Sequence, residues 1–273
     1  PLLNPDLSPD PRRFRDRGAA PPVQAAPWHP GKMGRTTLQV HFEPELHFFL
    51  PPRHRHATVG VEHDPTATLG HIVQSLGVPL TEVGALHADG RPVHPSHRPV
   101  PGRTLDVLAV RWPQPPAFDQ VRFVLDVHLG TLARRLRLLG VDTAYHNDRD
   151  DDALLHQAND ERRLLLTRDR ALLCRRNLRA GGHVRADHPD AQLREVLARF
   201  APDLHPFTRC PTCNGILRPV AKDQVQQELP PGTRATQSTF TRCTRCARVY
   251  WPGAHHAHLE KIVRQARELV PAH

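Results

Sequence analysis

Acidic residues follow apolar segments at three places in the chain, in a pattern that predicts a metal site. Asp126 directly follows RFVL, and Asp169 follows LLLTR. A third group lies just after VDTAYH, where a helix is expected to begin: Asp148, Asp150, Asp151 and Asp152. If these segments are parallel strands, their carboxyl ends meet at one edge of a sheet, where such folds bind ligands. Converging carboxylates without lysine partners repel one another and are usually held by a divalent cation. We therefore expect Mg²⁺ or Mn²⁺ at this edge, activating water for in-line attack on a phosphodiester.

Each of these residues also has a simpler explanation. Asp is a common cap where a helix follows a strand. Thr167 would either orient Asp169 or simply end a strand, and Arg168 and Arg170 would either bind phosphate or be solvated. Three acidic groups on one edge, with arginines beside them, favour the metal site over three unrelated caps.

Two cysteine pairs predict a second, structural metal site. Cys210-Pro-Thr-Cys213 and Cys243-Thr-Arg-Cys246 are two C-x₂-C pairs. Two such knuckles complete a tetrahedral Zn²⁺ site without an open position, so no catalysis is expected there. The long segment between the pairs predicts one extra hairpin, and the fifth cysteine, Cys174, is expected in the middle of a helix as a small core residue.

Arginines and aromatic residues surround these pairs and leave two interpretations open. The ribbon would either bind nucleic acid or only pack on the rest of the chain, with its aromatic residues as its core. The residues concerned are Arg209, Arg242, Arg245, Arg248, Tyr250 and Trp251. A second metal at His255, His256 and His258 is less favoured than a solvated cluster.

Strands and helices alternate over residues 120–206. Leucines recur on one face of LGTLARRLRLLG, and Gly140 is expected to end that helix. RRLLLT is too apolar for a sheet with one solvated face and is predicted to be a central parallel strand. The alternation predicts an α/β fold with helices on both faces of a parallel sheet. The amphipathic segment around KIVRQARELV predicts a final helix over 259–273.

Residues 36–112 predict a separate α+β unit. Two strands, a helix that begins after Thr68, and further strands around the Asp89-Gly90 turn follow the β-grasp order and resemble ubiquitin-like sulfur carriers. The last strand continues into a Pro-rich linker (113–119) without a terminal Gly-Gly, so we expect a binding or packing role rather than carrier chemistry. Residues 1–35 are rich in Pro, Arg and Ala and predict a disordered arm.

The composition limits the partners and the location. The net charge of +9 favours a polyanion, either nucleic acid or an anionic membrane surface, although an arginine-rich composition alone would also produce it. No apolar run is long enough to cross a membrane, and no secretory signal is evident. Paired cysteines in such a chain indicate metal rather than disulfides, and we expect a cytoplasmic protein.

Several of these segments together resemble one family. FVLDVHLGTLARRLRLLGVDTAY, DDDALLHQANDERRLLLTRDRALL, TRCPTCNGIL and CTRCARVYWPGAHH follow one another as in the RNase domain named after the C-terminal region of the mutator-seven exonuclease. The resemblance covers residues 38–258. It implies a PIN-like nuclease domain with a zinc ribbon over 207–258, and in bacteria often a ubiquitin-like domain in front.

The resemblance also implies roles for single residues. Asp126, Asp151 and Asp169 match the acids that hold the catalytic metal, with Asp152 as a substitute for its neighbour. Asp187 is a weak match to a further acid. Thr131 stands where the family often has a basic residue, so a substrate contact is expected at Arg134 or Arg135, with Arg168 and Arg170 as further phosphate contacts. The alternative is that Arg134, Arg135 and Arg137 form the solvent face of their helix, and this is the favoured role for Arg137.

The function predicted from all of this is metal-dependent hydrolysis of RNA. One alternative is an RNA-binding module that no longer cleaves. Another is an adaptor that binds a protein, as yet unknown, through its β-grasp domain.

Overall fold

A computed structural model describes residues 36–100 and 102–270, which all belong to one compact unit, Arg35–His273. The arm predicted over 1–35 lies outside the described residues. No helix within the described ranges is long and apolar enough to span a bilayer.

The first part of the unit is a five-stranded mixed sheet with the strand order β2-β1-β5-β3-β4. Its strands are β1 (Thr36–Phe42), β2 (Val59–His63), β3 (Val83–Ala88), β4 (Arg91–Val93) and β5 (Thr104–Ala109). The central strands β1 and β5 are parallel, and helix α1 (Leu69–Ser75) packs its buried residues against the sheet. Thr68 caps that helix by accepting a hydrogen bond from the His71 N–H, as predicted. This is the β-grasp arrangement, and we call it the ubiquitin-like sheet.

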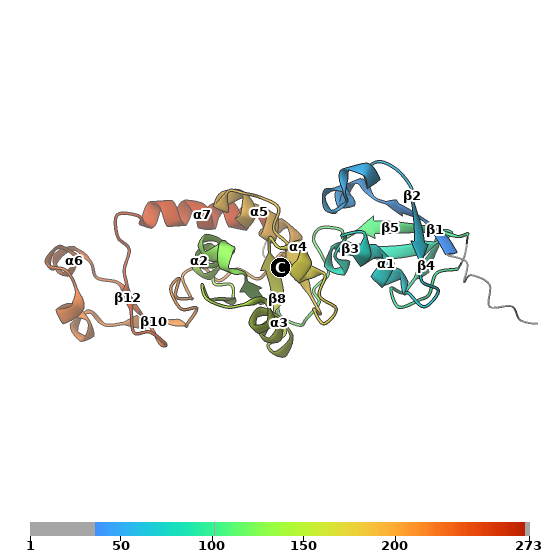
Figure 1. Ribbon diagram of the computed structural model, residues 1–273. Helices are drawn as coiled ribbons and strands as arrows, with labels where there is room; N and C mark the ends of the chain where they lie inside the picture. Colours follow the sequence, from blue (N-terminus) through green and yellow to red (C-terminus); the bar gives the residue numbers. More distant parts are fainter. Residues whose placement is uncertain (1–35, 101, 271–273) are drawn as a thin grey trace, which may run out of the picture. The chain divides into compact units, whose positions relative to one another are not determined.

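The second part is built on a four-stranded parallel sheet, which we call the nuclease sheet after the nuclease domain that the resemblance implies (Figure 1). Its order is β7-β6-β8-β9, with strands β7 (Thr143–Tyr145), β6 (Phe123–Leu125), β8 (Leu164–Thr167) and β9 (Gly181–His183). Every residue of β8 is buried, as its unbroken apolar run predicts for a central strand. Parallel pairing places the ends of all four strands along one edge, which we call the carboxyl edge.

Helices cover both faces of the nuclease sheet (Figure 1). On one face, Phe123, Leu125 and Leu166 pack with residues of α2 (Gly130–Leu138), α5 (Pro189–Phe200) and α7 (His256–Leu269). On the other face, Val124 and Leu165 pack with α3 (Asp151–Asp160) and α4 (Arg170–Leu173).

The ends of two helices show where the sequence predicted the boundaries well and where it did not. Gly140 follows α2 with a φ of +81°, and a side chain there would collide with the backbone of His205. The predicted third helix is only the single turn α4, because the chain leaves the helical conformation after Leu173. Cys174 is therefore the C-cap of a short helix and half-buried, and the expectation of a mid-helix core position was wrong.

The third part is a small antiparallel sheet, the ribbon, of β10 (Leu217–Val220), β11 (Phe240–Cys243) and β12 (Val249–Tyr250). The extra hairpin predicted between β10 and β11 was wrong. That segment instead forms the 3₁₀ turns Lys222–Gln224 and Gln226–Glu228 and the helix α6 (Pro231–Thr236). This segment has a small core of its own, formed by Val225, Leu229 and Phe240, which explains why short helices are stable there.

Candidate functional site

Asp126 lies at the carboxyl edge, directly after β6. Its backbone N–H continues the ladder by donating to Leu166 O at 3.0 Å. Its side chain is 7% exposed and accepts a hydrogen bond from the Val127 N–H at 2.6 Å. The position of this carboxylate is therefore fixed from both the strand and the turn that follows it.

Thr167, the last residue of β8, connects two of the predicted acids. Its hydroxyl donates to Asp126 Oδ2 at 2.6 Å and accepts from the Asp169 N–H at 2.9 Å. The Asp169 carboxylate in turn accepts from the Ala171 N–H at 2.7 Å and so caps α4. Asp169 is therefore a helix cap, as the simpler explanation has it, and Thr167 also holds the backbone of Asp169 beside Asp126.

Asp151 is the first residue of α3, and its ionisation depends on the acids near it. Burial raises the pKa of this carboxyl above its ordinary value, and the charges of Asp169 and Asp126 raise it further. Like charges act this way only when they are close enough to destabilise the ionised form. Asp151 therefore lies close enough to Asp126 and Asp169 for their charges to act on it.

The neighbouring acids have other partners. Asp150 caps α3 by accepting from the Ala153 N–H at 2.8 Å. Asp152 forms an ion pair with Arg175, which the sequence had not singled out. Asp187 pairs with Arg168. Asp152 nevertheless acts on the same place, since its charge, like those of Asp169 and Asp126, raises the pKa of Asp151.

The predicted substrate arginines have different surroundings. Arg134 is exposed on α2, whereas Arg135 is 2.7 Å from Asp190 in an ion pair. The guanidinium of Arg170 lies 4.4 Å from the centre of the Phe48 ring, which comes from the ubiquitin-like sheet. Arg168 is exposed, and its carbonyl accepts a hydrogen bond from His183 Nε2 at 3.0 Å.

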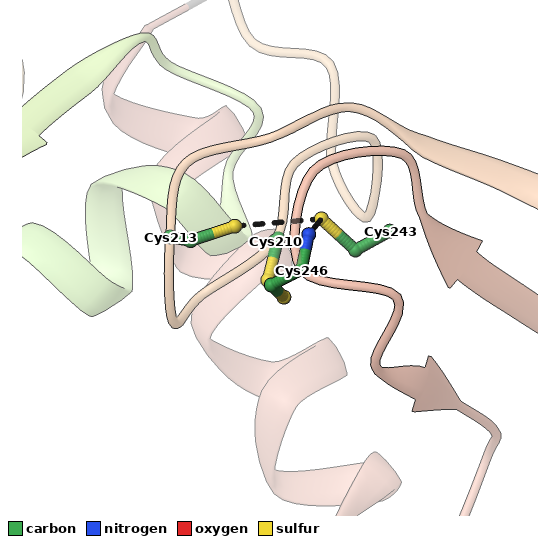
Figure 2. Close-up of side chains that lie close together, drawn as sticks. All are labelled: Cys210, Cys213, Cys243 and Cys246. Atoms are coloured by element: carbon green, nitrogen blue, oxygen red, sulfur yellow. Dashed lines mark hydrogen bonds between the residues drawn. The ribbon is translucent and has the colours of Figure 1, made fainter.

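The four paired cysteines form a second site (Figure 2). Their sulfur atoms all lie within 4.8 Å of one another, with Cys213 and Cys243 3.4 Å apart and Cys210 and Cys246 3.7 Å apart. Four thiolates about 2.3 Å from one tetrahedral ion would be roughly 3.8 Å apart, so the set fits Zn²⁺. Asn214, with a φ of +67°, makes the turn of the first knuckle, as its position after Cys213 predicts. Within the described ranges, neither the histidines near residue 256 nor the three carboxylates bring their ligand atoms as close together.

Comparison with known families decides the identity. Residues 121–263 match the Mut7-C RNAse domain, and residues 35–114 match the Mut7-C ubiquitin domain. The chain belongs to the Mut7-C RNAse domain family. No curated protein and no solved structure matches it. The ubiquitin-like sheet, the nuclease sheet and the four-cysteine ribbon are the architecture that the resemblance implied.

In this Mut7-C domain, Arg137 attaches the ribbon to the nuclease sheet. The expectation that it faces solvent was wrong, since it is only 3% exposed. It donates to Thr143 O in β7 at 2.8 Å, and to Pro211 O and Thr212 O in the first knuckle at 3.1 and 3.0 Å. Burial lowers the pKa of Arg137, and the nearby Cys213 and Cys210 oppose this shift.

Asp142 provides a second attachment of the ribbon. It accepts from Asn214 Nδ2 at 2.8 Å and from the buried Arg163 at 2.6 Å, and lies 3.3 Å from Arg209. Burial raises the pKa of Asp142, but the hydrogen bonds from Arg163 and Asn214 outweigh this and hold it below its ordinary value. The ribbon of the Mut7-C domain is thus fixed to the strand that precedes the acidic loop and α3.

The aromatic residues and arginines of the ribbon mostly have internal roles. Trp251 packs against Phe240, and the Tyr250 hydroxyl lies 3.0 Å from Cys210 Sγ. Arg242 pairs with Glu228 at 2.6 Å. Arg245 and Arg248 are exposed, although each donates one hydrogen bond to the first knuckle. These contacts favour packing over base stacking as the role of the aromatic residues.

Proposed function

We propose that this Mut7-C protein is a ribonuclease that hydrolyses RNA phosphodiesters with Mg²⁺ or Mn²⁺ held by Asp126, Asp151 and Asp169. The geometry that carries the proposal is the placement of three acids at the carboxyl edge: Thr167 links Asp126 to Asp169, and Asp151 begins α3. The charges of Asp169 and Asp126 raise the pKa of Asp151, and a divalent cation would relieve this repulsion. Carboxylate oxygen atoms are the ligands that Mg²⁺ and Mn²⁺ prefer.

The cation would supply a water of lowered pKa and neutralise charge on the phosphodiester. The chain's own residues prepare the site. Thr167 holds Asp126 and the backbone of Asp169 in a fixed relation, and the N-termini of α3 and α4 place Asp151 and Asp169 at the edge. Asp152 is kept as a reserve ligand, because releasing Arg175 would free its carboxylate.

Positive side chains would bind the phosphates on either side of the scissile bond. We assign this role to Arg168 and Arg170, which flank Asp169, and to Arg134 and Arg135 on α2. Arg168 and Arg134 are exposed, so both are accessible to a polyanion. Zn²⁺ at Cys210, Cys213, Cys243 and Cys246 has a structural role in this proposal, since a Cys₄ site leaves no position for substrate.

Cleavage of a labelled structured RNA tests the proposal. We expect cutting with Mn²⁺, none with EDTA, and none with Asp126→Asn or Asp169→Asn. Asp160→Asn is the matched control, because this exposed acid lies at the far end of α3 and its loss should leave cutting unchanged. Cutting that survives both site variants would refute the assignment. RNA binding without cutting by the wild-type protein would instead favour a non-cleaving RNA-binding module.

A further inference from the structure

The connection between β1 and β2 of the ubiquitin-like sheet is unusually long. It covers residues 43–58, whereas antiparallel strands are commonly joined by about 2–5 residues. It contains two 3₁₀ turns, Pro44–Phe49 and Pro52–His54, and a basic stretch, Arg53-His54-Arg55-His56. We call residues 43–58 the β1–β2 loop. Long ordered connections of this kind are usually functional.

A buried ion pair fixes the ubiquitin-like sheet against the nuclease sheet. Arg199 of α5 donates to both carboxylate oxygens of Glu82 at 2.9 and 3.0 Å, and both side chains are at most 4% exposed. Glu82 also accepts from the backbone N–H of His183 in β9 at 2.8 Å. Arg199 further donates to Thr81 O at 2.9 Å. These bonds place the β1–β2 loop in a defined position beside the carboxyl edge.

Two consecutive phenylalanines in the loop differ in burial. Phe49 is 2% exposed and belongs to the core of the ubiquitin-like sheet, whereas Phe48 is 39% exposed. The guanidinium carbon of Arg170 lies 4.4 Å from the centre of the Phe48 ring, and that of Arg185 lies 5.3 Å from it. Arg185 is also held by the loop, since it donates to Glu45 O at 3.1 Å. We call Phe48, Arg170 and Arg185 the platform.

The composition of the platform fits RNA better than a protein surface. Unpaired bases stack on aromatic rings and on the planes of guanidinium groups, and phosphates pair with arginine. Charged residues are depleted from the centres of protein–protein interfaces, whereas this ring is flanked by two cations. If the ring served only to seal the contact between the sheets, it would be buried as Phe49 is. The arginines of the β1–β2 loop extend the same positive charge.

We propose that the platform binds single-stranded RNA, with one base stacked on Phe48 and the adjoining phosphates bound by Arg170, Arg185 and the β1–β2 loop. The inference rests on the proposed function for the identity of the substrate. Arg170 directly follows Asp169, so a base held here belongs to a strand that passes the proposed metal ligands. The ubiquitin-like sheet thereby becomes part of the substrate-binding surface of the nuclease.

Binding measured without cleavage tests this inference separately from the proposed function. The probe is a fluorescently labelled single-stranded RNA oligonucleotide, and the full chain carries Asp126→Asn without added Mg²⁺ or Mn²⁺, so that nothing is cut and no chelator reaches the four-cysteine site. We expect Phe48→Ala to weaken binding roughly tenfold and Phe48→Tyr to retain it. Val100→Ala, at a side chain that is 57% exposed in the connection between β4 and β5, is the matched control and should leave the affinity unchanged.

The salt dependence of binding gives a second, independent measurement. Replacing Arg53 and Arg55 by Ala should lower the slope of log Kd against log salt concentration by about 0.7 for each phosphate that these side chains neutralise in the parent protein. Replacing Arg91 and Arg98 by Ala, on and just after the edge strand β4, is the charge-matched control and should leave the slope unchanged.

The outcomes distinguish the two proposals. Weaker binding by Phe48→Ala supports the platform even if the wild-type protein never cleaves RNA. Equal affinity of Phe48→Ala and the parent, with thermal unfolding showing both folded, overturns the platform even if the wild-type protein cleaves.

Discussion

Replacing Arg137 by Met should loosen the ribbon without unfolding the nuclease sheet. Met keeps most of the apolar stem but removes three hydrogen bonds, two of which reach Pro211 O and Thr212 O in the first knuckle. A hydrogen bond from a charged donor contributes about 1.5–3 kcal/mol, so losing these two should cost the attachment about 3 kcal/mol. The buried carbonyl of Thr143 also loses a partner, which adds to the cost rather than offsetting it.

Hydrogen exchange of the zinc-bound protein measures this directly. A loss of about 3 kcal/mol predicts roughly 100-fold faster exchange for the first knuckle, residues 208–216, when local opening controls the rate. Arg134→Met on the exposed face of the same helix is the control and should exchange like the wild type. Equal protection in Arg137→Met and Arg134→Met would refute the attachment. A chelator should abolish the difference in exchange rate between Arg137→Met and the wild type. The metal would order the knuckle whose carbonyls accept from Arg137, so losing the metal already removes what the substitution removes.

Two further predictions concern the acids. Thr167→Val should lower cleavage at limiting Mn²⁺ by about 10-fold or more, because the Asp126 carboxylate loses a hydrogen-bond donor and the Asp169 N–H loses its acceptor. Thr167→Ser keeps the hydroxyl and should retain most of the activity. If Thr167→Val and the wild type need the same Mn²⁺ concentration for cleavage, Thr167 does not orient the acids. Asp151→Asn should abolish cleavage yet raise the melting temperature of the metal-free protein at pH 7. The pKa of Asp151 in the folded protein is raised above 3.8, so the ionised carboxylate destabilises the fold at any pH above that raised value. The increase in melting temperature caused by Asp151→Asn should therefore shrink as the pH is lowered toward 3.8. An increase that does not depend on pH would argue against charge repulsion as its cause.

The sequence predicted the acids because their signal is local. Asp126 and Asp169 each follow an apolar strand, and parallel pairing of β6 with β8 then places them at one edge without any further information. The four-cysteine cluster is predicted equally well, since the spacing within each C-x₂-C pair already fixes the knuckle. The hairpin predicted between the pairs was wrong because Val225, Leu229 and Phe240 pack on one another. The spacing of these apolar residues along the sequence does not predict that contact.

Arg137 and Glu82 show what local patterns cannot predict. Each is a charged residue in an otherwise ordinary segment, and charged residues are rarely buried, so solvent exposure is the reasonable expectation for both. Their partners lie far along the chain: Arg137 meets residue 211, and Glu82 meets residue 199. A buried charge is tolerated only when such partners satisfy it, and removing one partner leaves an uncompensated charge. Both residues lie where separate parts of the chain meet, so in these two cases simple burial rules fail at positions that join the ribbon and the ubiquitin-like sheet to the nuclease sheet.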